Sequence, residues 1–521
     1  MVMSLQDCIN KISATISKTP QEQRDVVADI KRRGFLKQVT NTILFGLTMS
    51  TCAHKSIADT IIEDLPDLGD TDRSNLSPQQ ADMLGKQVVL NIYAQGGMVE
   101  DFDCLDYLNR LGNEFVSYSP MAGKDFNFYL VKDKDINAFA LPGGYICANN
   151  GLIYTTLSEA ELAGVVSHEV GHVIQHHIFR NISVHNRAQW TGIAGLVTAA
   201  ILAPINPAMA MVVAQGGSAA GTQSMLSFSR DYEREADRVG QNLMYKAGFD
   251  AHAMPEFFQR MQDRYKFNTN DAYAFLQSHP VTLERLSEAE TRANQLPTKM
   301  RADSIDFLLT REKCRIRQIE LKDALKFYNS AIATKRYVSL ESQLYGLALT
   351  HYLQKNYEQS IQTLDKISNP KFLINPIVAG LRAKQMIVIG KNDIADRLYE
   401  QSLARYPTHK GLWMGQLEFL IMIRAYPKAA YRLDELSLAF PMDPDVWDQY
   451  AILYSDAKYN NPIRYHYGLG SEYIVLGHYP HGLEQYRAAL KKKPANKEDD
   501  KIQSIISARI PEIMRAMPSK S

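Results

Sequence analysis

Two histidines and a glutamate form the clearest chemical pattern in this sequence. Residues 167–177 read Ser-His-Glu-Val-Gly-His-Val-Ile-Gln-His-His, so His168 and His172 are four residues apart and Glu169 follows the first. On a helix this spacing puts both imidazoles on one face, where they can hold one metal ion. Zinc lowers the pKa of a bound water towards neutrality, and Glu169 is placed to accept the proton. The pattern predicts hydrolytic chemistry with one Zn²⁺ per chain.

A catalytic zinc ion needs a third protein ligand and an open position for water. The sequence lacks a His-x-x-Gly-x-x-His continuation, so a carboxylate from a later helix is the more favoured third ligand. Glu233 and Asp237 are four residues apart and share a helix face, whereas Glu235 points roughly the other way. One of the two can bind zinc while the other hydrogen-bonds a ligand imidazole and fixes its tautomer. The spacing does not decide whether Glu233 or Asp237 binds the zinc ion. The alternative for this segment is a solvated helix with no role in metal binding.

The elements around these residues carry recognisable start signals. Ser158-Glu-Ala-Glu161 is a capping box that begins the helix carrying His168. His176 and His177 are expected to continue that helix as non-ligands. Residues 137–146 predict a hairpin, which is either an ordinary core element or an edge strand that pairs with an extended substrate. Other predicted elements are helices from residue 76 and over 104–115, and a strand over 126–131.

Beyond residue 305 or so, the pattern changes to helical repeats. Pro407 and Pro441 are 34 residues apart, which is the tetratricopeptide period. Each helix pair of such a repeat exposes an apolar face that only a neighbouring pair can cover. Aromatic and small residues fit the repeat frame in three copies: Ala395, Tyr399 and Ser402; Trp413, Tyr426, Ala429, Leu433 and Leu436; Gly470, Tyr473, Tyr486 and Ala489.

The N-terminal residues have the pattern of an export signal. Residues 31–37 are Lys-Arg-Arg-Gly-Phe-Leu-Lys, followed by a modest apolar run over 39–53, which is the layout of a twin-arginine export signal. Cys52 raises lipidation as an alternative, although the preceding Met-Ser-Thr is a poor lipidation motif. A second apolar segment, 190–226, is interrupted by prolines, and we expect either a buried helical hairpin or an element that contacts a membrane surface.

Composition excludes several classes of protein. The 521 residues are 45% apolar and 22% charged, as in ordinary globular domains, and allow two to four folding units. The 58 Lys+Arg balance 57 Asp+Glu, which argues against nucleic-acid binding as the main activity. Five scattered cysteines do not make a disulfide scaffold, and the chain has no clean run of 18 apolar residues that would indicate a polytopic membrane protein.

Together these motifs resemble a known family. His168-Glu-x-x-His172 followed by Glu233-x-x-x-Asp237 is similar to the gluzincin endopeptidases related to the CaaX prenyl proteases, and most of all to their BepA/YfgC-like periplasmic members with C-terminal tetratricopeptide repeats. Further matching segments span roughly residues 76–295, namely 76–78, 108–115 (LNRLGNEF), 137–144, 151–153, 229–230 and Ser278-His-Pro280. The long twin-arginine-like leader departs from the family's ordinary secretory leaders.

The resemblance implies roles for particular residues. It implies that Glu233 is the third zinc ligand, that Glu169 is the general base, and that Asp237 supports catalysis. His279 lies in the family's Ser-His-Pro loop near the metal. It is expected to be an oxyanion contact or a fourth ligand that silences the enzyme, with a plain loop histidine as the alternative.

The sequence therefore predicts an α+β protein, with a mainly helical gluzincin-type domain containing a small β-sheet, followed by an all-α tetratricopeptide superhelix. The expected order is an export signal (1–53), a linker (54–75), a zinc metallopeptidase domain (76–300) and the repeats (301–521). The expected function is a periplasmic zinc endopeptidase acting in quality control or assembly of outer-membrane proteins. Its partners would be misassembled outer-membrane proteins, the barrel-assembly machinery reached through the repeats, and peripherally the membrane through 190–226. The alternative is a chaperone or scaffold with a structural or self-inhibited zinc site.

Overall fold

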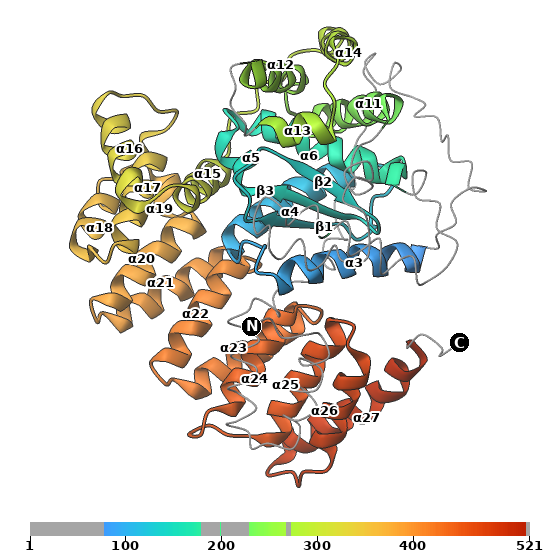
Figure 1. Cartoon of the computed structure of the whole chain (residues 1–521). Helices are drawn as coiled ribbons and strands as arrows, with labels where there is room; N and C mark the ends of the chain where they lie inside the picture. The colour runs from blue at the N-terminus through green and yellow to red at the C-terminus, as the bar shows by residue number, and fades with distance from the viewer. Residues whose placement is uncertain (1–77, 179–197, 199–228, 267–271, 517–521) are drawn as a thin grey trace, which may run out of the picture. The chain divides into compact units, whose positions relative to one another are not determined.

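The computed structural model describes residues 78–178, 198, 229–266 and 272–516 (Figure 1). The predicted export signal, the linker and, apart from Thr198, the apolar segment 190–226 lie outside these residues and stay predictions. The described residues form two compact units. We call them the peptidase unit (78–89 and 108–303) and the repeat unit (90–107 and 304–516). The domain boundaries expected from the sequence stay a prediction.

A three-stranded sheet lies at the centre of the peptidase unit. Its strands are β1 (Asn127–Val131), β2 (Ala138–Leu141) and β3 (Tyr145–Asn149), in the order β1-β3-β2. β1 pairs with β3 in parallel, and β2 pairs with β3 antiparallel. The predicted hairpin is therefore confirmed, and its turn uses Gly143 and Gly144 at φ +81° and +84°, where only glycine is free of strain. Strand β2 lies at one edge of the sheet.

Helices surround this sheet. Among the described residues, those of the peptidase unit are α5 (Asn150–Thr155), α6 (Glu159–Ile174), α11 (Arg230–Lys246), α12 (Ala253–Lys266), α13 (Tyr273–Ser278) and α14 (Leu283–Asn294). Helices α3 (Pro78–Ala94) and α4 (Phe102–Ser117), both predicted from the sequence, contribute residues to both units. Every strand residue except Asn127 is buried, as expected of a sheet covered on both faces.

Helices α6 and α11 pack directly against one another. Two glycines allow the close approach. A Cβ atom on Gly171 of α6 would lie 2.9 Å from the carbonyl oxygen of Ala236, and one on Gly240 of α11 would lie 2.9 Å from the backbone nitrogen of His168. Either side chain would force the two helices apart, so these glycines fix the distance between the His168 and Glu233 segments.

The repeat unit is helical throughout its described C-terminal part. Its helices are α15 (Ile305–Gln318), α16 (Leu321–Ala333), α17 (Leu340–Leu353), α18 (Tyr357–Leu364), α19 (Pro370–Leu373), α20 (Pro376–Val388), α21 (Asn392–Arg405), α22 (Lys410–Met422), α23 (Tyr426–Ala439), α24 (Pro444–Ser455), α25 (Pro462–Val475), α26 (Tyr479–Leu490) and α27 (Lys497–Ala516). Successive helices pack as neighbours from α15 to α18 and from α19 to α27, and α18 packs against α20 (Figure 1). Together with the sheet of the peptidase unit, this confirms the predicted α+β fold class.

The residues that carried the repeat pattern lie in the core. Ala395 and Tyr399 of α21, Leu433 of α23, and Tyr486 and Ala489 of α26 are all at most 1% exposed and belong to one hydrophobic cluster. Their burial explains the pattern, because each aromatic or small residue fills the contact between consecutive helices.

A charged cluster also lies in the repeat unit, where Asp101 and Lys313 are buried and their partners Asp103 and Arg317 are partly exposed. The side chain of Asp101 caps the start of α4 by accepting hydrogen bonds from the backbone N–H groups of Asp103 and Cys104 at 3.1 and 3.2 Å. The same carboxylate accepts a hydrogen bond from Lys313 at 2.7 Å and pairs with Arg317. Lys313 also pairs with Asp103. Two carboxylates and two cations thus neutralise one another.

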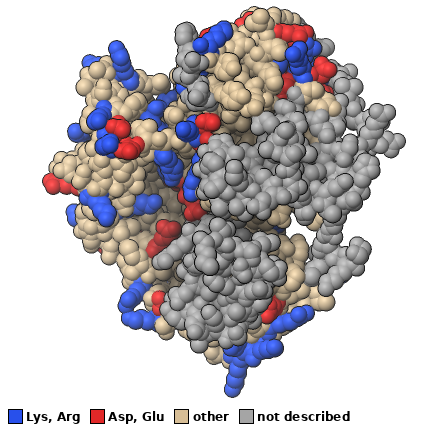
Figure 2. Space-filling model, in the orientation of Figure 1, with Lys and Arg blue, Asp and Glu red and all other residues tan. Residues whose placement is uncertain are grey.

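The surface carries charge of both signs. On the face drawn in Figure 2, lysine and arginine side chains are interspersed with aspartate and glutamate over the described residues, in keeping with the balanced composition. Within the described part of the chain, no helix combines the length and apolar character that crossing a membrane requires.

Candidate metal centre

Helix α6 carries the first three predicted site residues, and its start is fixed as the sequence predicts. The hydroxyl of Ser158 accepts a hydrogen bond from the backbone N–H of Glu161 at 3.2 Å. The Glu161 carboxylate accepts one from the N–H of Leu157 at 2.7 Å and is held by Arg260. Because the helix begins at a defined residue, the direction in which the His168 side chain points from the helix is defined as well.

Four side chains converge between α6, α11 and the loop after α13. The Nε2 atoms of His168 and His172 lie 2.9 Å apart, and Glu233 Oε1 lies 3.3 Å from His172 Nε2. Nδ1 of His279 lies 3.3 Å from His168 Nε2 and 3.2 Å from Glu233 Oε1. One ligand atom from each of the four lies within 4.8 Å of all the others, and all four residues are at most 1% exposed. The arrangement suits a single metal ion.

Glu169 lies next to this cluster with its acceptors unused. Both carboxylate oxygens are buried, and neither makes a well-formed hydrogen bond to any described residue. His279 Nε2 is 3.4 Å from Oε1. Burial raises the pKa of Glu169, and the nearby His279 and His168 offset this only in part. A buried carboxylate of this kind is poised to take up a proton.

Asp237 and Arg285 form a second layer behind the cluster. Asp237 Oδ1 lies 2.9 Å from Nδ1 of His168, the ring nitrogen that faces away from the cluster. Arg285 donates to both oxygens of Asp237 at 2.8 Å and lies 2.7 Å from Glu233 Oε2. Burial alone would raise the pKa of Asp237, but Arg285 and His168 outweigh it and lower that pKa to about 2. Asp237 is therefore an ionised carboxylate beside the outer ring nitrogen of His168.

The Ser-His-Pro segment is anchored to the sheet. Ser278, at the end of α13, donates a hydrogen bond to the side chain of Asn137 at 3.1 Å. His279 Nε2 lies 3.3 Å from the carbonyl oxygen of Ala138 in strand β2. These contacts hold the His279 ring between the edge strand and the ligand cluster.

The electrostatics of the cluster favour a cation. Burial lowers the pKa of His172 to about 3, so this imidazole is neutral. Burial also acts to lower the pKa of His168, yet its hydrogen bonds to Asp237 and Glu233 raise it to about 10. A positive charge at the His168 position is thus stabilised by two carboxylates, and a metal ion would supply that charge.

Comparisons with known proteins also support a metal site in this unit. The model of the family described as "Peptidase family M48" matches residues 106–293. A "Beta-barrel assembly-enhancing protease" of Yersinia pestis is 29% identical over 399 residues, which cover 74% of this chain and 79% of that protein. A relative from Vibrio cholerae is 30% identical over 330 residues, which cover 63% of this chain and 68% of that protein. The chain belongs to peptidase family M48.

Two more distant similarities complete the comparison. A "Mitochondrial metalloendopeptidase OMA1" of Schizosaccharomyces pombe is 27% identical over 184 residues, which cover 35% of this chain and 51% of that protein. Among solved structures, a tetratricopeptide repeat protein from Parabacteroides merdae covers 51% of this chain and 96% of its own, at 14% identity and a TM-score of 0.24. That score is too low to carry an argument about the fold.

Membership of the M48 family makes this chain a metallopeptidase with a metal cofactor. The residues present fit such a cofactor: the four converging side chains are ligands that a divalent transition metal accepts, and the orphaned carboxylate of Glu169 faces the same space. The structure thus brings together all six site residues predicted from the sequence. Their individual roles stay predictions.

Arg285 is a member of the M48 site that the sequence analysis missed. It is fully buried in the first turn of α14, after the N-cap Thr282, and it contacts both Glu233 and Asp237. Its position six residues after His279 gives no periodic signal. The available clue was chemical, since three buried carboxylates in one site require a compensating cation.

The environment of His177 also differs from expectation. The sequence analysis expected His176 and His177 to continue α6, but the helix ends at Ile174 and His176 adopts φ +54°. That left-handed residue turns the chain before His177, whose side chain is fully buried. His177 Nδ1 lies 3.0 Å from Nδ1 of His172, and its Nε2 lies 3.0 Å from Glu235 Oε2. His177 thus lies outside the ligand cluster, as predicted, yet it contacts one of its members.

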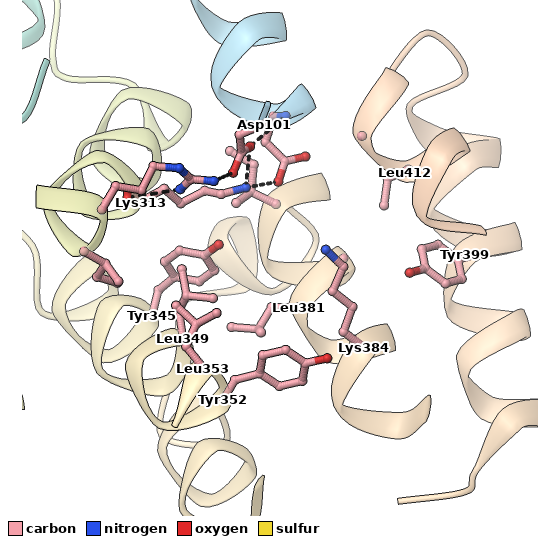
Figure 3. Close-up of a pocket in the computed structure, with 16 residues that line it drawn as sticks. Asp101, Lys313, Tyr345, Leu349, Tyr352, Leu353, Leu381, Lys384, Tyr399 and Leu412 are labelled. Carbon is pink, nitrogen blue, oxygen red and sulfur yellow. Dashed lines mark hydrogen bonds and ion pairs between the residues drawn. The ribbon is translucent and has the colours of Figure 1, made fainter. Parts of the chain in front are cut away.

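A second concave feature belongs to the repeat unit. A cavity of about 470 Å³ is lined by residues of α15, α17, α20, α21 and α22 together with the Asp101 cluster (Figure 3). Tyr345, Tyr352 and Leu349 of α17 form one wall, and Leu381 and Lys384 of α20 form another. Its volume is within the usual range for ligand sites in proteins.

Proposed function

We propose that this chain is a zinc-dependent endopeptidase of the bacterial periplasm, with His168, His172 and Glu233 as zinc ligands and Glu169 as general base. The observation that carries the proposal is the buried carboxylate of Glu169, which lies beside a cluster suited to one metal ion and makes no well-formed hydrogen bond to a described residue, with His279 Nε2 3.4 Å away. A site that only stabilises the fold has no use for such an acceptor.

Each residue of the site has its own proposed role in peptide hydrolysis. A zinc ion in the cluster supplies a Lewis acid that polarises the scissile carbonyl and acidifies the attacking water. Glu169 takes the proton from that water and returns it to the leaving amine, for which its raised pKa suits it. Asp237 and Arg285 hold His168 and Glu233 in position through the contacts of 2.7–2.9 Å described above.

The edge strand β2 supports an extended mode of substrate binding. β2 lies at one end of the strand order, and its residue Ala138 is next to His279 and the cluster. A peptide that adds to this edge in an extended conformation runs past the catalytic residues, so main-chain hydrogen bonds supply affinity without demanding a particular sequence.

His279 favours a second, latent state of the same enzyme. Its Nδ1 is within 3.3 Å of both His168 and Glu233, where a fourth ligand would close the open position. In this state the protein would act as a chaperone or scaffold through its repeats until His279 is displaced.

Three purified proteins test the catalytic proposal: the wild type, Glu169→Gln and His279→Ala. We expect stoichiometric zinc by elemental analysis in each, and casein cleavage that falls by about 10³-fold in Glu169→Gln. A rate in His279→Ala above that of the wild type would support the latent state. Equal cleavage by the wild type and Glu169→Gln, or a wild type that binds no zinc, would contradict the proposal.

The repeat unit is proposed to bind protein clients, by analogy with relatives whose name refers to barrel assembly. On that basis the proposed clients are misassembled outer-membrane proteins, and the proposed partner is the barrel-assembly machinery. Residues 190–226 are proposed to contact the membrane surface peripherally. The cavity in Figure 3 fits an unfolded client segment. Its tyrosine and leucine walls accept an apolar side chain, and the exposed Lys384, which makes no ion pair with any described residue, accepts a neighbouring carboxylate.

Fluorescently labelled casein, an unfolded acidic protein, probes this cavity in the non-cleaving Glu169→Gln background. Lys384→Glu and Tyr352→Ala are expected to weaken binding by about tenfold each. Lys391→Glu is the matched control, because Lys391 is an exposed lysine that does not line the cavity. Equal binding by all four proteins would exclude the cavity as the client site while leaving the peptidase proposal intact.

A further inference from the structure

The two histidines of α6 are supported in different ways. His168 is held directly by a carboxylate, since Asp237 Oδ1 lies 2.9 Å from its Nδ1. At the corresponding nitrogen of His172 the structure places a third imidazole, with Nδ1 of His177 at 3.0 Å. Glu235 Oε2 lies 3.0 Å from the other nitrogen of the His177 ring.

We propose that Glu235 and His177 form a relay that fixes the tautomer and orientation of His172, with His177 as a positioning residue for the metal centre. The inference rests on the proposed zinc site. It assigns a function to Glu235, the one acidic residue of the Glu233–Asp237 segment that faces away from the ligand cluster.

Hydrogen-bond chemistry allows only one arrangement of protons along this chain when a metal is bound. His172 Nε2 faces the cluster and must offer its lone pair to the metal, so the proton of its neutral ring is on Nδ1. That N–H donates to Nδ1 of His177, which must then be unprotonated. The proton of His177 is therefore on Nε2, where it donates to the carboxylate of Glu235. Glu235 accepts only, and this selects the tautomer of both rings.

The surroundings hold His177 in the required place. Its ring is fully buried and stacks on Tyr232 with the ring centroids 4.5 Å apart and an interplanar angle of 12°. Tyr232 is in the first turn of α11, whose N-cap Ser229 accepts a hydrogen bond from the Tyr232 N–H. Helix α11 thus supplies a carboxylate to each support: Asp237 for His168, and Glu235, through His177, for His172.

Zinc affinity, measured by competition with a chromophoric chelator, tests the relay. His177→Phe keeps the aromatic stacking and removes both nitrogens, and we expect its zinc dissociation constant to rise by 10- to 100-fold. Glu235→Gln is expected to weaken binding less. Arg234→Gln is the matched control, because Arg234 is the neighbouring residue of α11 and pairs only with the exposed Asp231, Glu284 and Glu288 among the described residues. Its affinity should equal that of the wild type.

The double variant separates a relay from two independent effects. If Glu235 acts through His177, adding Glu235→Gln to His177→Phe changes the affinity no further; additive losses would overturn the proposal.

Thermal unfolding of the metal-free proteins is the second readout, and we expect equal midpoints for the wild type and Glu235→Gln. Should His177→Phe fail to fold, His177→Gln takes its place, because its side-chain carbonyl can still accept from His172 and should restore part of the affinity. A wild type that binds no zinc would instead refute the proposed function, whereas unchanged affinity in the variants refutes the relay alone.

Discussion

Each unit of the molecule holds a cluster of charged side chains with a buried centre, and the two clusters differ in how well their charges balance. In the repeat unit, Asp101 and Asp103 face Lys313 and Arg317, so the charges cancel. In the peptidase unit, three fully buried carboxylates (Glu169, Glu233 and Asp237) face a single guanidinium, that of Arg285. The first cluster is complete in itself, whereas the second has a surplus of two negative charges.

The difference distinguishes a charged cluster that stabilises the fold from one that can bind a metal ion. Burying a charge is costly unless a partner compensates it, so a balanced cluster can be retained for the fold alone. An unbalanced cluster needs a proton or a cation from outside the chain: in the repeat unit, buried Lys410 faces both Asp443 and Asp445, and burial raises the pKa of Asp443 to about 6. The surplus in the peptidase unit equals the charge of one divalent metal ion, and the atoms that could ligate it already converge. Charge imbalance together with the convergence of metal-ligating atoms identifies the site.

Glu169 offers the largest test of this comparison. We expect Glu169→Gln to lower kcat/KM for peptide cleavage by about 10³-fold, which corresponds to about 4 kcal/mol. The free energy of unfolding of the metal-free protein should not fall, because the substitution replaces an only partly compensated buried carboxylate by a neutral amide. Urea unfolding with the metal removed measures this second quantity. A variant that is both active and destabilised would mean that Glu169 serves the fold.

The opposite result is expected in the balanced cluster. Asp101→Asn retains a good N-cap for α4 but removes the charge that Lys313 and Arg317 face. We expect a loss of about 3 kcal/mol in the free energy of unfolding, because Arg317 loses its carboxylate partner and the buried Lys313 keeps only Asp103. Peptide cleavage at saturating zinc and a permissive temperature should be unchanged. Asp393→Asn is the control, since Asp393 and Arg397 form an exposed pair whose loss should cost at most about 0.5 kcal/mol.

Removal of the metal should affect one unit and spare the other. A ligand at 100 times its dissociation constant stabilises the binding unit by about 2.7 kcal/mol. After chelation, amide hydrogen exchange should therefore quicken in α6 and α11, while exchange in α22 to α26 stays the same. Readdition of zinc should restore protection. Equal loss of protection in both groups of helices would show that the metal supports the whole chain.

The smallest expected effect is the acid dependence of the repeat unit. Burial tends to raise the pKa of Asp101, but Lys313 and Arg317 outweigh it and hold that pKa below its ordinary value. The stabilisation is therefore complete above the ordinary aspartate pKa of about 4 and is lost as the pH falls through the lower pKa of the folded chain. The difference in unfolding free energy between the wild type and Asp101→Asn should be constant from about pH 5 to 7 and shrink below about pH 4. A difference that grows on acidification would contradict this.

Local rules account for the part of the site that sequence could predict. The four-residue spacing of His168 and His172, the capping box at Ser158 and the shared face of Glu233 and Asp237 follow from helix periodicity, which acts within a few residues. The repeat pattern was predictable for the same reason, because each position recurs with the period of the helix pair.

Contacts between distant residues account for the rest. Arg285 meets Asp237 across 48 residues and His279 meets His168 across 111, and no periodicity relates such positions. The contact of His177 with His172 follows a turn at His176, whose positive φ lies between the end of the helix and the histidine that was expected to continue it.

The sequence by itself determined the kind of chemistry, the residues of α6 that carry it and the helical nature of the repeats, because these depend on local geometry and residue type. Only the tertiary structure decided which carboxylate faces the ligand cluster, which one supports a histidine, and which cation compensates them. Those choices depend on how α6, α11 and α14 pack together, and close packing at Gly171 and Gly240 brings the charges within reach of one another.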